Sequence, residues 1–221
     1  MRYARQEALE QIGRQGQKKL LKSKVVIVGV GALGTVTCEL LARAGVGEIL
    51  LIDNDEVHLV NLQRQLFLEE DIGKSKAKVM QKRVSQINKD VKVKVFEEFL
   101  TEQNSNVLTG YDLILDCTDN MKARQVINAH CKTSKQIWIH AAGSSVKGNL
   151  VVIDDPERFE KIFKTAQTFD SCEEIGVINS LTMTISSLQV VEAIKILTDQ
   201  SYCKDLIRIN LWENKYERYK I

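Results

Sequence analysis

The sequence has few of the features that mark a metal site, a secreted protein or a nucleic-acid binder. Its five cysteines and three histidines include no C-x-x-C pair and no histidines at metal-ligand spacing, so no zinc is expected. An odd number of scattered cysteines indicates free thiols in a reducing compartment. The 31 basic residues nearly balance the 29 acidic ones, which argues against nucleic acid as a partner.

Long apolar segments and linkers are also lacking. The N-terminal stretch MRYARQEALEQIG has no signal-peptide core, and no run approaches the roughly 18 apolar residues that a membrane span needs. We therefore expect a cytoplasmic protein without membrane contact. No linker, low-complexity tract or repeat divides the 221 residues, so one domain is expected.

Apolar runs separated by helix-like patterns are the main structural signal present. The runs are VVIVG, EILLID, VKVKVF, YDLILD and QIWIH. This alternation predicts an α/β fold with a Rossmann-like, doubly wound, mostly parallel sheet. Residues 24–153 would form a nucleotide-binding core, preceded by an N-terminal helical arm at 1–23 with one helix at roughly 6–22.

The alternation changes after residue 153. KGNLVVID predicts one more strand, and the only proline, Pro156, lies where a helix would begin. A long buried helix is expected at 178–197, and DLIRINLWEN with KYERYKI predicts an antiparallel hairpin around Asn214. Residues 154–221 would thus hold a crossover region, a long helix and a closing hairpin.

A glycine-rich turn follows the first predicted strand. Gly29, Gly31 and Gly34 form G-x-G-x-x-G before a predicted helix, and Asp53 ends the next strand. In this context the glycines let the backbone approach phosphate at a helix N-terminus, and the acid accepts hydrogen bonds from ribose. A glycine turn without a ligand is the less favoured alternative. From the loop alone, an NAD- or FAD-dependent dehydrogenase is the first candidate.

The segment after Asp53 favours a triphosphate over a dinucleotide. Attack on an α-phosphorus develops negative charge that fixed Arg and Lys groups stabilise, and Arg64 and Lys76 are the candidates. The alternative for the lysines at 74, 76 and 78 is a solvated helix face. The whole polar set is Asn61, Gln63, Arg64, Gln65, Lys74 and Lys76.

The run YDLILD is followed by further acid. Asp116 and Asp119 are expected at the carboxyl edge of the sheet, where α/β proteins bind ligands. A carboxylate there can hold Mg²⁺ against phosphate oxygens. The alternative for Asp119 is the N-cap of a helix that begins near Asn120.

Together these motifs resemble the ubiquitin-activating-enzyme-like superfamily, in particular its ThiF/MoeB/HesA branch of small adenylyltransferases. The matching stretches are RYARQ, GVGALG, LLIDND, NLQRQ, EEDIGKSKA, LILDCTDN, CEEIGV and SLQVVEAIKIL. The resemblance implies a single adenylation domain over residues 1–221. It would use ATP to convert the C-terminal glycine carboxylate of a small ubiquitin-like or sulfur-carrier protein into an acyl-adenylate, with release of pyrophosphate. The partner would be a β-grasp protein ending in Gly-Gly.

The resemblance also implies roles for individual residues. Arg64 and Lys76 would neutralise the phosphates, and Asp119 would coordinate Mg²⁺. Members are typically homodimers in which an arginine of the RQ segment, here Arg5, reaches the partner's nucleotide. The implied nucleotide-binding residues are Gly29, Gly31, Gly34, Asp53, Asp55, Asn61, Arg64 and Lys76.

The sequence departs from the family at several points, and these leave alternatives open. Cys172 matches a thiol that receives the acyl group in some relatives, but Glu173 and Glu174 beside it disfavour a thiolate. The paired C-x-x-C motifs and a rhodanese-type extension are lacking, so any sulfur donor would be a separate protein. Other acyl substrates, such as a peptide or a modified tRNA base, and a non-catalytic nucleotide-binding subunit stay as alternatives.

Overall fold

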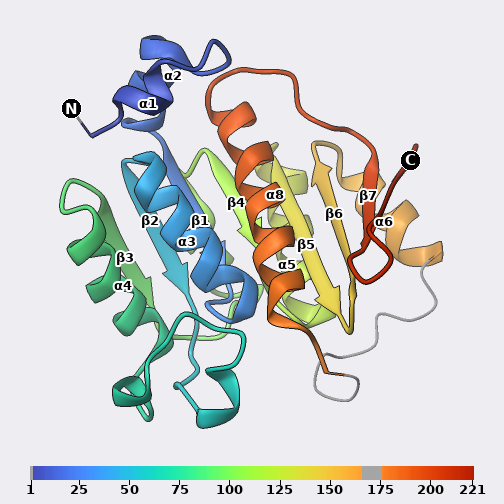
Figure 1. The fold of residues 1–221 in the computed structure, drawn as a ribbon. Coiled ribbons are helices and arrows are strands. Elements are labelled where there is room, and N and C mark those ends of the chain that lie inside the picture. Colours follow the sequence, from blue (N-terminus) through green and yellow to red (C-terminus); the bar gives the residue numbers. More distant parts are fainter. Residues whose placement is uncertain (1, 166–175) are drawn as a thin grey trace.

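The computed structural model describes residues 2–165 and 176–221. They contain one eight-stranded sheet with the order β3-β2-β1-β4-β5-β6-β7-β8, flanked by helices on both faces (Figure 1). The predicted doubly wound α/β fold is confirmed. The strands are β1 (Lys24–Val28), β2 (Glu48–Ile52), β3 (Lys92–Phe96), β4 (Leu113–Asp116), β5 (Trp138–Ser144), β6 (Lys147–Ile153), β7 (Leu206–Asn210) and β8 (Lys215–Tyr219).

The helices divide between the two faces of the sheet. Helices α3, α4 and α8 cover one face, and α5 and α6 cover the other (Figure 1). The α-helices are α1 (Ala4–Glu7), α2 (Gly13–Leu20), α3 (Ala32–Ala44), α4 (Lys76–Ile87), α5 (Met121–Ser134), α6 (Pro156–Thr165) and α8 (Asn179–Leu197). Three short 3₁₀ helices are η1 (Leu59–Asn61), η2 (Glu69–Asp71) and η3 (Ser105–Leu108).

The strand register brings three chain segments together. Strands β3, β2, β1, β4 and β5 run parallel, whereas β6, β7 and β8 run antiparallel and include the predicted hairpin. Val28 pairs with Ile52 on one side and with Asp116 on the other. The carboxyl ends of β1, β2 and β4 therefore lie side by side. Because the chain order reverses between β1 and β4, this is the switch point where such sheets bind ligands.

The central strand β1 is buried on both faces. Val25 and Ile27 pack into the cluster under α3 and α8, and Val26 and Val28 pack into the cluster under α5. A strand covered on both faces reads as a continuous apolar run, because each face contacts a helix layer. The run KVVIV is therefore a direct consequence of its central position.

The N-terminal arm differs from the prediction. The expected single helix at 6–22 is two helices, α1 and α2, separated by turns at residues 8–12. Gly13, the first residue of α2, has φ of 58°, a left-handed conformation that cannot occur inside a continuous right-handed helix. The arm packs on the carboxyl end of α3, where Gln6 and Gln17 both donate to the carbonyl of Ala44.

Helix α8 corrects the expectation that no segment would suit a membrane. Its 19 residues are long and apolar enough to span a bilayer, with a mean hydropathy of 1.2. Half of the helix is buried, and it packs against α3, β5 and β6. A core helix meets the same length and composition criteria, so the finding is weak evidence for a membrane span.

Candidate functional site

A cleft of about 1540 Å³ opens at the carboxyl ends of β1, β2 and β4. The loops that follow these strands line it with the glycine turn, the acidic turn at Asp53 and the segment around Asp119. The loop between β2 and α4 adds Asn61 and Arg64, and the first residue of α4 adds Lys76. The structure thus gathers the residues that the sequence places far apart into one site.

The three glycines meet different demands. Gly29 has φ of 88°, and a Cβ there would lie 2.7 Å from the carbonyl oxygen of Cys117. A Cβ on Gly34 would lie 1.9 Å from the carbonyl oxygen of Gly29, so this glycine lets α3 pack directly on the turn. Among the described residues, a Cβ on Gly31 would have one neighbour within 4 Å, Nε2 of Gln65 at 3.7 Å. Gly31 therefore leaves room in the cleft for a group that approaches the backbone.

Asp53 is held against the glycine turn. Its carboxylate accepts hydrogen bonds from the backbone amides of Val30 (2.6 Å) and Asp55 (2.8 Å). Burial raises the pKa of Asp53, although the two amide hydrogen bonds oppose that shift. The turn and the acid are therefore one rigid unit, as a ribose-binding acid beside a phosphate-binding turn requires.

The structure separates Lys74, Lys76 and Lys78 by the exposure of their side chains, which the sequence alone could not do. Lys74 and Lys78 are solvated, with 56% and 63% of their side chains exposed, and pair with Asp71 and Glu97. Lys76 is only 7% exposed and pairs with Asp55 at 2.5 Å. Burial acts to raise the pKa of Asp55, but the hydrogen bond and charge of Lys76 outweigh it and lower that pKa.

The β2–α4 loop also contains Gln65, a cleft residue to which the sequence assigned no role. Arg64 is half-buried in the cleft and donates from Nη1 to the carbonyl of Val60 (2.8 Å), while Asn61 accepts from the amide of His58 (3.0 Å). Gln65 also lines the cleft, and its buried Oε1 has no hydrogen-bond partner among the described residues. The flanking amides of NLQRQ gave no signal that separated Gln65 from Gln63.

The acid that ends β4, Asp116, and the acid that follows it, Asp119, have different positions. Asp119 is exposed in the cleft and makes no hydrogen bond or ion pair with another described residue. The N-cap of α5 is Asn120, which accepts from the amide of Ala123 at 2.9 Å, so the cap alternative for Asp119 is wrong. The prediction for Asp116 also needs correction, because its side chain is fully buried and cannot meet a ligand in the cleft.

A magnesium ion fits the donor set. Within residues 2–165 and 176–221 no cluster of three or more His, Cys, Asp or Glu is arranged to hold a metal. Mg²⁺ usually keeps several waters and takes only one or two carboxylates in addition to substrate phosphates. Asp119 offers such a carboxylate, with its oxygens uncommitted to the described residues.

One predicted site residue, Arg5, is not brought to the cleft. Arg5 is exposed on α1, and the neighbouring Gln6 contacts Ala44 at the carboxyl end of α3. The glycine turn lies at the other end of this helix, about 20 Å away for its 13 residues. Arg5 therefore does not line the cleft of its own chain. Cys172 lies outside the described residues.

Loops without a recognised motif complete the cleft. Phe99 and Leu100 follow β3 and give one wall apolar character, while Ser144, Lys147 and Asn149 come from β5 and β6. No motif marks these loop residues or the residues at the adjoining ends of β5 and β6, so the sequence alone did not identify them. The cleft is consequently longer than the predicted nucleotide contacts and has a polar extension along β5 and β6.

Comparison with known proteins agrees with this arrangement. The ThiF family model matches residues 3–221. The chain belongs to the ThiF family. The sulfur carrier protein ThiS adenylyltransferase of Escherichia coli (strain K12) is 41% identical over 204 residues, which cover 90% of this chain and 81% of that protein. The sulfur carrier protein adenylyltransferase of Thermus thermophilus is 33% identical, over 89% of this chain and 77% of that protein.

The ThiF-family fold is also seen in a solved structure. The crystal structure of Escherichia coli MccB with ATP has a TM-score of 0.80 at 24% identity, covering 93% of this chain and 66% of that one. At this identity the likeness concerns the fold alone. Family and relatives together make this chain a ThiF-type adenylyltransferase, which leaves the dehydrogenase alternative without support.

Proposed function

We propose that this protein uses ATP to adenylate the C-terminal glycine carboxylate of a small β-grasp sulfur-carrier or ubiquitin-like protein and releases pyrophosphate. The observation that carries the proposal is the single cleft that contains the glycine turn, Asp53, Lys76 and Asp119. The relatives named as sulfur carrier adenylyltransferases support the choice of acyl substrate. The likeness to MccB, solved with ATP, agrees with the choice of nucleotide.

The chemistry follows from the charges in the cleft. The ribose would bind at Asp53 and the phosphates would lie over Gly31 towards Lys76 and Arg64. The carrier's carboxylate would attack the α-phosphorus, and the bond to pyrophosphate would break. Arg64 and Lys76 would stabilise the negative charge that develops on the phosphate oxygens. Lys76 would exchange its pairing with Asp55 for phosphate, since the two groups compete for one ammonium.

No general base is needed in this mechanism. The attacking group is already a carboxylate at neutral pH, and pyrophosphate leaves as an anion. Mg²⁺ held at Asp119 would neutralise phosphate charge when bound. The chain's own task is therefore to orient two anions and to offset their repulsion.

The wider assembly is part of the same proposal. A homodimer would place Arg5 of one protomer at the nucleotide of the other, which agrees with its distance from the cleft of its own chain. The polar extension along β5 and β6, with Lys147 and Asn149, would receive the carrier's C-terminal tail. We place the protein in the cytoplasm, with any sulfur donor as a separate protein.

ATP–pyrophosphate exchange with a β-grasp carrier ending in Gly-Gly tests the proposal. Exchange should need the carrier, fail with a carrier lacking Gly-Gly and be lost in Asp119→Ala. Glu157→Ala is the control, because it removes an exposed carboxylate from the first turn of α6, away from the cleft. It should retain wild-type exchange.

Other results would select an alternative. Exchange that needs a peptide or a tRNA would show a different acyl substrate. ATP binding without exchange for any acyl substrate would indicate a non-catalytic subunit.

A further inference from the structure

The turn that presents Asp119 is held from beneath by buried side chains. Asp119 itself has no polar contact with the described residues, so its position depends on the backbone of Thr118 to Asn120. That backbone joins β4 to α5 and is the only covalent link between them. A carboxylate can bind a metal reproducibly only if its turn is fixed.

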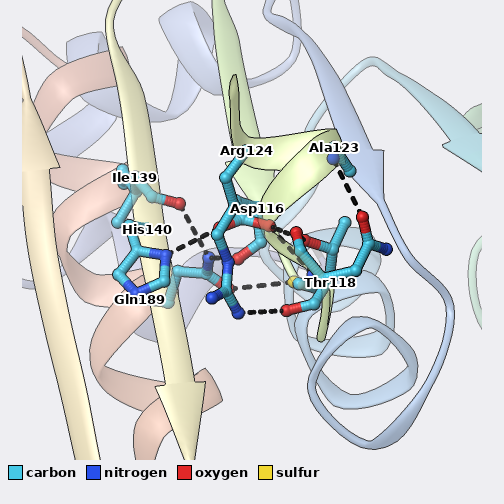
Figure 2. A network of polar contacts seen from close by, with 9 residues as sticks. Asp116, Thr118, Ala123, Arg124, Ile139, His140 and Gln189 are labelled. Atoms are coloured by element: carbon cyan, nitrogen blue, oxygen red, sulfur yellow. Dashed lines mark hydrogen bonds and ion pairs between the residues drawn. The ribbon is translucent and has the colours of Figure 1, made fainter. Parts of the chain in front are cut away.

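Both backbone polar groups of Thr118 are anchored to buried charged side chains (Figure 2). The amide of Thr118 donates to Oδ1 of Asp116 at 2.9 Å, and its hydroxyl donates to the same oxygen at 2.6 Å. The carbonyl of Thr118 accepts from Nη2 of Arg124 at 2.7 Å. The two peptide units that flank the Thr118 Cα are thus each held by one contact, so a change in φ or ψ at Thr118 would break at least one of them.

The two anchors also hold each other. Nε of Arg124 lies 3.4 Å from Oδ2 of Asp116, and Nδ1 of His140 donates to that oxygen at 2.7 Å. Asp116 and Arg124 are 0% and 4% exposed. Burial of a carboxylate acts to raise its pKa, but His140 and Arg124 outweigh this and lower the pKa of Asp116. The carboxylate therefore stays ionised and keeps both sets of contacts.

Helix α8 fixes the same network from the opposite face of the sheet. Gln189 donates from Nε2 to the carbonyl of Asp116 (3.0 Å) and to that of Ile139 (3.2 Å). Its Oε1 accepts from the hydroxyl of Thr37 on α3 (2.9 Å). The end of β4 is thus tied to α3, β5 and α8, and the network cannot shift independently of the core.

We infer that Arg124 is a positioning residue for metal binding: it holds the Thr118 carbonyl and the Asp116 carboxylate so that Asp119 points into the cleft. The inference rests on the proposed function of Asp119. Arg124 contacts a carboxylate with one nitrogen and a carbonyl with another, which the fork of a guanidinium allows. A lysine has a single nitrogen and cannot keep both contacts in this geometry.

A direct phosphate contact by Arg124 is the competing role, since this residue also lines the cleft. The two roles make different predictions. Loss of a phosphate ligand raises the KM for ATP and weakens nucleotide binding without metal. Loss of a positioning contact changes the metal dependence and kcat, because the nucleotide's own contacts are intact.

The test compares Arg124→Lys with Arg158→Lys. Arg158 also joins a carboxylate, that of Asp154, to a backbone carbonyl, that of Lys204, but lies away from the cleft. The Mg²⁺ concentration for half-maximal exchange should rise about tenfold in Arg124→Lys, because residues behind a metal ligand typically contribute 10–100-fold to metal affinity. Its KM for ATP should stay at the wild-type value, and Arg158→Lys should match wild type throughout.

A binding measurement gives a readout other than activity. Mn²⁺ binding to protein loaded with a non-hydrolysable ATP analogue, followed by electron paramagnetic resonance, should weaken about tenfold in Arg124→Lys and not in Arg158→Lys. If Arg124→Lys does not fold, Thr118→Val removes the hydroxyl contact to Asp116 and leaves the ion pair intact. Thr118→Val should also weaken Mn²⁺ binding. In a separate rescue experiment, added guanidinium ion should restore exchange to Arg124→Ala.

The outcomes separate this inference from the proposed function. Wild-type protein that binds Mn²⁺ with the analogue but catalyses no exchange would overturn the proposed function alone. Unchanged Mn²⁺ binding in a folded Arg124→Lys or Thr118→Val protein would overturn the inference alone. A raised KM for ATP with unchanged metal dependence would assign Arg124 to the phosphates and also overturn it.

Discussion

Substitution of single glycines in the nucleotide turn should separate folding from binding. Gly34 and Gly31 are three residues apart, and both line or support the same turn. A methyl group on Gly34 meets backbone, whereas one on Gly31 meets the cleft. Gly34→Ala should therefore destabilise the fold, and Gly31→Ala should mainly weaken ATP binding.

The magnitude for Gly34→Ala follows from the contact distances. Its Cβ would lie 1.9 Å from the oxygen and 2.9 Å from the carbon of the Gly29 carbonyl, and a backbone group cannot move aside as a flexible side chain can. Overpacking typically costs about 1–3 kcal/mol, and a contact this short belongs at the upper end or above. Alanine gains about 1 kcal/mol of helix propensity in α3, which leaves a net loss of about 2 kcal/mol or more.

Thermal melting with ATP titration measures both effects. For a chain of this length, a loss of about 2 kcal/mol lowers Tm by roughly 4–8 °C in Gly34→Ala. Gly31 is the N-cap of α3, where alanine is a poor residue, so Gly31→Ala should cost no more than about 1 kcal/mol, or roughly 2–4 °C. ATP binding by Gly31→Ala should weaken about tenfold or more, which is 1.4 kcal/mol or more.

Two results would refute this account of the turn. A wild-type Tm for Gly34→Ala would show that α3 does not pack on the Gly29 carbonyl as described. Wild-type ATP affinity in Gly31→Ala would show that the nucleotide does not approach the backbone there.

Two further predictions concern charge. Lys76→Ala should lower pyrophosphate exchange about 100-fold, a typical loss for one charge-stabilising group, while the exposed Lys78→Ala keeps wild-type exchange in the same assay. Equal losses in both variants would contradict a special role for Lys76. Burial lowers the pKa of His140 below its ordinary 6.5 and outweighs the hydrogen bond to Asp116. Because the unfolded histidine binds a proton that the folded one resists, the free energy of unfolding should fall as the pH drops below 6.5. Urea unfolding at pH 7.5 and 5.5 should show a smaller fall for His140→Gln, and an equal fall would contradict the assignment.

The sequence predicted the layout of the sheet because its signals are local. The run KVVIV is apolar on both faces, and the glycine turn after it is fixed by contacts within the same strand–turn–helix unit. At the antiparallel end of the sheet, the sequence predicted the β7–β8 hairpin around Asn214. Asn214 has φ of 53°, a left-handed turn conformation that asparagine tolerates. The single helix expected at 6–22 was wrong, because Gly13 with its positive φ interrupts a pattern whose periodicity alone favours one helix.

The site was predicted only in part, because burial and pairing depend on distant residues. The sequence pattern cannot tell which of Lys74, Lys76 and Lys78 is buried. Lys76 differs in the fold because it is buried and pairs with Asp55, whereas the other two are exposed. Asp116 was expected at the cleft, but partners 8 and 24 residues further along the chain keep it buried.

Intact mass spectrometry of the carrier tests the central claim most directly. The purified protein would be incubated with ATP, Mg²⁺ and a β-grasp protein ending in Gly-Gly, in the presence of pyrophosphatase. The account predicts a carrier heavier by one AMP, absent when Asp119→Ala replaces the wild type or when the terminal glycine is removed. A carrier of unchanged mass, from wild-type protein that demonstrably binds both ATP and the carrier, would contradict it.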